Sequence, residues 1–128
     1  MAGKFLLDAN IIIALFSGEK RVAERIAGTE VLVPSTALGE LYYGARKSAH
    51  AAENLARIEQ FAAATQVLRC DAVTAWIYGD IRNHLRLKGR PIPENDIWIA
   101  ATAIQYDVTL ATRDEHFDNV SDLKRENW

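Results

Sequence analysis

The segment that most constrains the fold is a short apolar run near the start of the chain, Lys4-Phe5-Leu6-Leu7, which stops at the carboxylate of Asp8. Consecutive apolar residues, without the alternation of a half-exposed strand, indicate a strand that is buried on both faces, as in a parallel sheet. Asp8 then stands at the carboxyl end of this strand. Because open α/β sheets bind ligands at the carboxyl ends of their strands, Asp8 is a first candidate for a functional site.

Length and composition predict one globular domain that spans residues 1–128. The chain is 49% hydrophobic and 25% charged, with no linker and no repeat, which is enough apolar material to cover both faces of a small sheet. The formal net charge of −2 excludes a broadly basic surface, although a local patch can still bind phosphate. With a single cysteine, Cys70, and no membrane-spanning or signal pattern, we expect a cytoplasmic protein with no membrane partner.

The rest of the chain alternates predicted strands with predicted helices. Further strands are expected at residues 29–33, 66–68 and 108–111, with a last short edge strand or cap in the tail. Helices are expected at residues 11–16, 19–27, 35–45, 49–64, 71–89 and 94–104. Ser35 or Thr36 is the expected N-cap of the third helix, and Asp71 that of the fifth. The fold class is therefore α/β, a three-layer α/β/α sandwich with a mainly parallel central sheet.

Three of the acidic residues of interest each have an ordinary structural explanation. Asp8 could cap the helix expected from Ile11, Asp114 could cap a turn through His116, and Asp96 could lie in the first turn of a helix, where the helix dipole favours a negative charge. Glu40 is different, because it does not stand three residues after either expected cap and so completes no capping box.

Together these acidic residues favour a metal site. In a parallel sheet the ends of two strands and the starts of the helices that follow share one rim, which would bring Asp8, Glu40, Asp96 and Asp114 close together. Two carboxylates ~4 Å apart at an effective dielectric near 20 repel by about 4 kcal/mol. A divalent cation removes that conflict, and ligands that are all oxygen suit Mg²⁺ or Mn²⁺ better than zinc.

Such a site predicts phosphodiester hydrolysis. Hard metal ions held by carboxylates activate water and stabilise the charge that develops on phosphorus. Candidate contacts to an RNA backbone are Arg82 and Arg86 on the long fifth helix and Arg113 beside Asp114. The alternative for each of these arginines is a solvated helix face or loop.

Four short motifs make the chain resemble the PIN-domain ribonucleases, and specifically the VapC-type toxins of bacterial toxin–antitoxin pairs. They are Leu7-Asp8-Ala9-Asn10, then Pro34-Ser35 with Glu40-Leu41 and Gly44, then Asn95-Asp96 with Ile99-Ala100-Ala101-Thr102-Ala103, and finally Leu110-Ala111-Thr112-Arg113-Asp114-Glu115-His116-Phe117. The order and spacing of these motifs extend over nearly the whole chain. The family commonly has Thr or Ser after the first Asp, whereas this chain has Ala9 and so lacks that hydroxyl.

The resemblance implies a PIN-like fold, a Mg²⁺- or Mn²⁺-dependent endoribonuclease acting on RNA, a homodimer, and inhibition by a cognate VapB-type antitoxin. It also implies that Asp8, Glu40, Asp96 and Asp114 are the acidic residues of the catalytic site. Asp8 and Asp96 would be the principal metal ligands, with Glu40 and Asp114 completing the set. Asn10 and Thr112 would orient these carboxylates or a water molecule.

Two other functions fit parts of the pattern. An aspartate-nucleophile phosphatase would explain an Asp after the first strand, but that class needs a second Asp two residues later, where this chain has Asn10. A catalytically silent PIN-like scaffold that binds RNA or protein would explain the fold, but it has no use for four carboxylates. Manganese binding separates such a scaffold from a nuclease.

Overall fold

The computed structural model describes residues 3–128 as five strands and six α-helices with one 3₁₀ turn. The strands are β1 Lys4–Leu7, β2 Glu30–Pro34, β3 Gln66–Leu68, β4 Thr109–Ala111 and β5 Arg125–Glu126. The helices are α1 Ala9–Phe16, α2 Lys20–Ala27, α3 Ser35–Lys47, α4 Ala51–Ala64, α5 Ala72–Lys88 and α6 Glu94–Gln105, and the 3₁₀ turn is η1 Glu115–Asn119. The order of elements agrees with the order predicted from the sequence.

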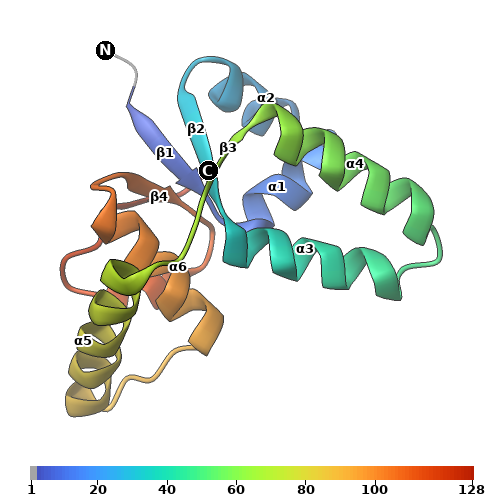
Figure 1. Cartoon of the computed structure of the whole chain (residues 1–128). Helices are drawn as coiled ribbons and strands as arrows, with labels where there is room; N and C mark the ends of the chain where they lie inside the picture. Colours follow the sequence, from blue (N-terminus) through green and yellow to red (C-terminus); the bar gives the residue numbers. More distant parts are fainter. Residues whose placement is uncertain (1–2) are drawn as a thin grey trace.

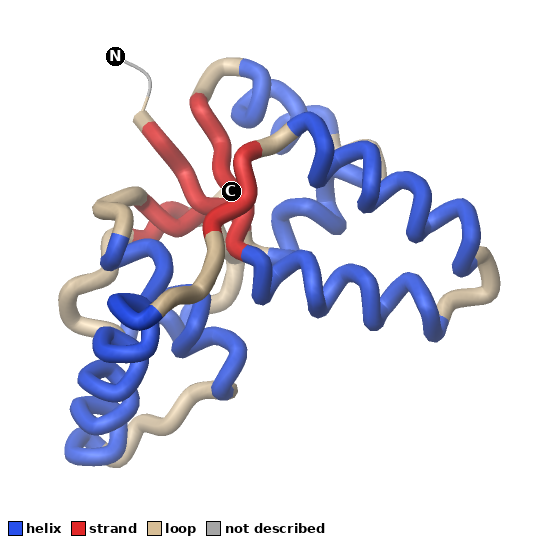
Figure 2. Tube along the Cα trace, in the orientation of Figure 1, coloured by secondary structure: helices blue, strands red, loops and turns tan. Residues whose placement is uncertain are grey.

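The strands form one sheet in the order β3-β2-β1-β4-β5, and all four neighbouring pairs are parallel. The central strand β1 pairs through Phe5 with Val31 of β2 on one side and with Thr109 of β4 on the other. Figure 1 shows the α3–α4 hairpin on one side of the sheet and the α5–α6 pair on the other. The tube in Figure 2 shows the same three layers, which confirms the predicted α/β/α class.

The chain changes direction across the sheet at β1. The connections from β1 to β2 and from β2 to β3 run outward on one side, whereas the connection through α5 and α6 returns past β1 to β4. Parallel strands require such crossovers, and the crevice opens where the two directions diverge. The carboxyl ends of β1 and β4 therefore flank the expected ligand site of this fold.

The core that holds these strands in place is apolar and almost fully closed to solvent. Leu6 and Leu7 of β1, Val33 of β2 and Leu110 of β4 are each 0% exposed. On either side of the sheet, Ile11 and Ile12 of α1 and the run from Ile97 to Ala103 of α6 cover them. The buried run of α6 explains why that helix lacks a polar face after its first turn.

The cap of α3 and the start of α1 differ from the sequence prediction. The N-cap of α3 is Pro34, with no side-chain cap, so the expectation of a Ser35 or Thr36 cap is wrong. The extended backbone of Pro34, which is also the last residue of β2, lets the helix begin immediately after the strand. Helix α1 begins at Ala9, two residues earlier than expected, because Asp8 itself is the cap.

In the described part of the chain, no helix combines the length and the apolar character that crossing a bilayer requires.

Replacing Gly89 by Ala should lower the free energy of unfolding by about 1 kcal/mol, because Gly89 ends α5 in the left-handed region at φ +66°. The matched control is Gly79→Ala in the middle of the same helix, where an added Cβ meets nothing within 4 Å. That substitution should stabilise by roughly 0.5–1 kcal/mol. Urea unfolding of the two variants checks the opposite signs, and destabilisation by both would contradict the assigned role of Gly89.

Candidate active site

Asp8 occupies the carboxyl end of β1 and is only 5% exposed. Its backbone N–H donates to the carbonyl of Ala111 at 3.0 Å, which continues the β1–β4 ladder beyond the last paired residues. Its Oδ1 accepts a 2.8 Å hydrogen bond from the N–H of Ala9, so one oxygen caps α1. The other oxygen, Oδ2, remains for interactions across the rim of the sheet.

The side chains of Thr112 and Asn10 orient this second oxygen. The buried Thr112 hydroxyl donates to Asp8 Oδ2 at 2.7 Å. Asn10 Nδ2 donates to Thr112 Oγ1 at 3.2 Å and lies 3.4 Å from Asp8 Oδ2. A carboxylate held from both sides in this way has little rotational freedom, so its position at the crevice is set by β4 as well as by β1.

Glu40 lies half-buried on α3 with an unpaired oxygen. Its Oε1 is buried and has no hydrogen-bond partner, and the same holds for Thr36 Oγ1 one turn earlier. Burial raises the pKa of the Glu40 carboxyl to about 7, and the charges of Asp8 and Asp96 add to the rise. A buried carboxylate oxygen without a partner is costly, which indicates that this position serves a ligand rather than stability.

Asp96 lies in the first turn of α6, where it too is half-buried. Burial raises its pKa to about 6; the charges of Asp8 and Asp114 raise it further, while His116 opposes the shift. The pKa of Asp8 is also raised, again chiefly by burial, against the hydrogen bonds from Thr112 and Ala9. These mutual effects show that residues from β1, α3, α6 and the end of β4 lie close enough to repel one another.

Asp114 follows β4, and its charge contributes to the raised pKa values of Asp8 and Asp96. Its Oδ1 accepts a 2.9 Å hydrogen bond from the N–H of His116 and so caps η1. The imidazole Nδ1 of His116 also lies 2.9 Å from this oxygen. The capping explanation therefore holds for Asp114 as it does for Asp8, and in both residues it occupies only one of the two carboxylate oxygens.

The four carboxylates affect one another electrostatically but do not form a ready set of metal ligands. Among residues 3–128, no three His, Cys, Asp or Glu side chains are arranged around a common point that could hold a metal ion. The residues present nevertheless fit a hard cation: all the donors are oxygen, three of the pKa values are raised, and Glu40 Oε1 is buried without a partner. A dication near Asp8 would relieve both the repulsion and the missing contact.

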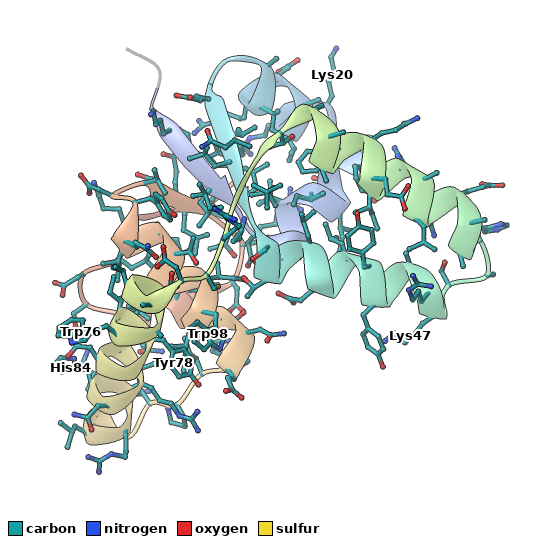
Figure 3. All side chains as sticks on the ribbon, viewed as in Figure 1. Lys20, Lys47, Trp76, Tyr78, His84 and Trp98 are labelled. Atoms are coloured by element: carbon teal, nitrogen blue, oxygen red, sulfur yellow. The ribbon has the colours of Figure 1, made fainter. Side chains whose placement is uncertain are left out.

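The arginines predicted to bind RNA lie in different surroundings. Arg82 on α5 donates to the Tyr78 hydroxyl at 2.7 Å and lies 3.7 Å from Glu94, in the same turn of α6 as Asp96. Arg86 donates to the side chain of Asn83 at 2.9 Å. Figure 3 shows Tyr78 and Trp98 where α5 and α6 face each other. Their rings are stacked, with centroids 4.0 Å apart. Arg82 is thus the arginine of this pair that contacts the first turn of α6, through Glu94.

The guanidinium of Arg113 donates to other groups of the protein. Its guanidinium forms a double contact with Glu19, at 2.8 and 3.1 Å, and also donates to the main-chain oxygen of Trp128. Sequence reasoning missed Glu19 and Trp128 as neighbours of the site, since they lie 94 and 15 positions from Arg113. The available signals were an arginine beside the last acidic motif and an aromatic residue in an otherwise polar tail.

A groove of about 430 Å³ leads away from Glu40 between α1, α3 and α4. Its walls are mostly apolar, and the exposed Ile13 stands at its edge. The lining residues are Ile13, Phe16, Ser17, Glu40, Leu41, Gly44, Ala45, Asn54, Arg57 and Ile58. A mostly apolar groove with a carboxylate among its lining residues can hold an apolar peptide segment that carries a basic side chain.

Comparisons with known proteins identify the family of this chain and its fold. Residues 5–123 match the PIN domain family. The chain is 34% identical to Ribonuclease VapC2 of Haemophilus influenzae and 36% identical to the tRNA(fMet)-specific endonuclease VapC of Shigella flexneri, in each case over 98% of both chains. Its fold matches the crystal structure of DNA-bound VapBC from Salmonella typhimurium with a TM-score of 0.91 and 32% identity, over 100% of this chain and 99% of that one.

The fold and the site thus define a PIN-type α/β protein with an acidic rim. The chain belongs to the PIN-domain family, among its VapC-type ribonucleases. The resemblance seen in the sequence motifs is confirmed.

Replacing Glu40 by Gln should raise the melting temperature of the metal-free protein at pH 8 but not at pH 5. The raised pKa, about 7 in the folded state against an ordinary value of 4.5, means that folding takes up a proton between these values. The free energy of unfolding therefore falls as pH rises through this window, and Gln removes that loss. The gain at pH 8 should be about 4 °C for each kcal/mol of repulsion relieved.

Thermal unfolding in EDTA at both pH values is the measurement for this variant. Glu59→Gln makes the same change on the exposed surface of α4 and is the control. An equal shift of the melting temperature by Glu40→Gln at pH 5 and pH 8 would show that repulsion at the rim is not its cause.

Proposed function

We propose that this chain is a metal-dependent endoribonuclease and the toxin component of a type II toxin–antitoxin module. The observation that carries the proposal is the set of carboxylates at the divergence of β1 and β4, with Glu40 Oε1 buried and unpaired. The relatives that match over the full chain are named ribonucleases and endonucleases, which supports the same activity. All four acidic positions predicted from the sequence are part of this proposal.

Asp8 and Asp96 are proposed to hold the principal Mg²⁺ or Mn²⁺ ion, with Glu40 and Asp114 completing the set. The bound ion would activate water and stabilise the charge on phosphorus during in-line attack. Thr112 and Asn10 keep Asp8 oriented toward the crevice. Glu40, with a pKa near neutrality in the metal-free protein, is suited to accept the proton of the attacking water, directly or through solvent.

The proposed substrate is RNA, guided to the rim by Arg82 and Arg86. Both side chains lie on the exposed face of α5 and line a cavity of about 460 Å³ with Ile92 and Ile97. Arginine is suited to this role because its planar guanidinium pairs with phosphate oxygens. Since one relative is named as specific for tRNA(fMet), a tRNA is the first substrate to test.

A VapB-type antitoxin is the proposed partner. Solved structures similar to this chain include VapBC complexes from Rickettsia felis and from nontypeable Haemophilus influenzae, as well as the complex named above. We propose that a segment of the antitoxin covers the acidic rim and presents a basic side chain to the carboxylates, with its apolar residues in the groove beside Glu40. The homodimer and the cytoplasmic location expected from the sequence stay predictions.

The two alternatives remain less well supported. A silent PIN-like scaffold gives no reason for Glu40 to keep a buried oxygen without a partner. In the aspartate-nucleophile reading, Asn10 would have to replace an acid, and the structure instead bonds Asn10 to Thr112. Tight Mn²⁺ binding in solution distinguishes the nuclease from the scaffold, and a trapped aspartyl-phosphate would favour the phosphatase.

Replacing Asp8 by Asn should reduce Mg²⁺-dependent RNA cleavage by about 100-fold or more while the chain still folds cooperatively. Asn keeps the oxygen that caps α1, but it loses the charge that binds the ion and places an NH₂ group opposite the Thr112 hydroxyl. The control is Asp107→Asn, which removes a carboxylate that is paired with Lys124 after the last turn of α6. Cleavage of a tRNA in the presence and absence of EDTA is the measurement, and full activity of Asp8→Asn would refute the assigned role.

Filling the groove should weaken inhibition by the antitoxin. At Gly44 of α3, which lines the groove, an added Cβ meets nothing within 4 Å, so Gly44→Leu should fold normally but occupy the space of an antitoxin side chain. We expect about tenfold weaker binding of the cognate antitoxin, equivalent to about 1.4 kcal/mol. The control is Gly79→Leu on α5, where a Cβ is equally free of contacts. Unchanged affinity of Gly44→Leu, measured by calorimetry, would place the antitoxin elsewhere.

A further inference from the structure

The turn that follows β4, Thr112-Arg113-Asp114, is held by a segment from the end of the described chain. The N–H of Thr112 donates to the main-chain oxygen of Glu126 at 3.1 Å. Arg125 Nη1 donates to the carbonyl of Thr112, also at 3.1 Å. Both main-chain polar groups of Thr112 are therefore bound by β5, which lies at the edge of the sheet.

The side chain of Arg113 extends this support on the other side of the turn. Nη1 and Nη2 donate to the two carboxylate oxygens of Glu19, at 3.1 and 2.8 Å. Nε and Nη2 donate to the main-chain oxygen of Trp128, at 3.3 and 3.1 Å. These four contacts use four of the five N–H donors that an arginine side chain has, which leaves little of the guanidinium free for a phosphate.

Trp128, whose main-chain oxygen accepts two of these hydrogen bonds, is buried and packed against its neighbours. It is 6% exposed, and its ring lies 4.9 Å from the ring of Phe5 in β1. The guanidinium of Arg25 lies over the Trp128 ring at 4.9 Å, and the indole Nε1 donates to Glu126 at 3.1 Å. Arg113 is thus tied to β1, the same strand that delivers Asp8.

A short chain of hydrogen bonds connects Arg113 with the acidic rim. The backbone N–H of Arg113 donates to Asn10 Oδ1 at 3.4 Å, and Asn10 in turn donates to Thr112 Oγ1. The N–H of Asp114 donates to the same Thr112 oxygen at 3.1 Å. Because Thr112 Oγ1 donates to Asp8, a shift of the turn at Arg113 moves the two side chains, Thr112 and Asn10, that lie against Asp8 Oδ2.

We infer that Arg113 is a positioning residue: clamped between Glu19 and Trp128, it fixes the turn that orients the carboxylates of Asp8 and Asp114. Its role is to hold the acidic rim in shape, and not to contact the RNA backbone. This inference rests on the proposed function, since the orientation of these carboxylates matters only if they act on a substrate. Glu19 and Trp128 share this positioning role, because they hold the Arg113 guanidinium in place.

The first test compares two substitutions that remove the same charge. Glu19→Gln removes the partner of Arg113, whereas the control Glu30→Gln removes an exposed glutamate that is paired with Lys4 at the start of β1. Calorimetric titration of the full chain with Mn²⁺ should show about tenfold weaker binding for Glu19→Gln and no change for Glu30→Gln. Equal Mn²⁺ affinity of Glu19→Gln and the wild type would overturn the inference.

The kinetics of RNA cleavage separate positioning from a direct RNA contact, because the two roles predict different effects. Under the inference, Glu19→Gln and Arg113→Gln both lower kcat and leave KM unchanged, and the double variant is no worse than Arg113→Gln alone. If Arg113 bound RNA, Arg113→Gln would raise KM, whereas Glu19→Gln would free the guanidinium and lower KM. This second pattern would overturn the inference.

A metal-free measurement tests the clamp independently of the nuclease activity. In ¹H–¹⁵N NMR spectra recorded in EDTA, Glu19→Gln should shift the signals of the Asn10 side-chain amide and of the Asp114 backbone amide, and Glu30→Gln should not. Unshifted signals in Glu19→Gln would refute the clamp. Since no metal or RNA is present, this result stands even if Asp8→Asn were to show that the proposed nuclease function is wrong.

Discussion

The structure of the site depends on one hydrogen bond, from the buried hydroxyl of Thr112 to the carboxylate of Asp8. It joins the carboxyl ends of β1 and β4, the two neighbouring strands at which the path of the chain across the sheet reverses. Asp8 is otherwise a buried charge in an apolar core, which is costly unless its oxygens are bonded. One oxygen caps α1 and the other faces Thr112, so a single residue begins a helix and presents a charge to the crevice.

Around this bond, burial and neighbouring negative charges both raise the pKa values of the carboxyl groups. Asp8, Glu40 and Asp96 all have raised pKa values with burial as the first cause and neighbouring carboxylates as a further one. A protein selected only for stability would not gather acids in this way, because each one weakens the folded state at neutral pH. The arrangement is understandable if a cation, and then a partner with a basic side chain, occupies this rim.

Much of the fold follows from local sequence patterns. The apolar run of β1, the cap at Asp71, the terminal Gly89 and the mostly apolar body of α6 each predicted an element within a few residues of its bounds. The prediction failed at Ser35 and Thr36, where Pro34 made a side-chain cap unnecessary. For Asp8 and Asp114, capping a helix does not exclude a place at the rim, because each carboxylate has two oxygens. In Asp8 one oxygen caps α1 and the other accepts from Thr112.

By itself the sequence determined the class of fold and the set of acidic positions, because both depend on periodicity and on where a strand or helix ends along the chain. Only the tertiary structure decided the partners of Arg113 and the unpaired state of Glu40 Oε1. These depend on distances between elements that are far apart in sequence, such as Glu19 and Arg113, 94 positions from each other. Such distances are set by how helices and strands pack, and no local pattern encodes them.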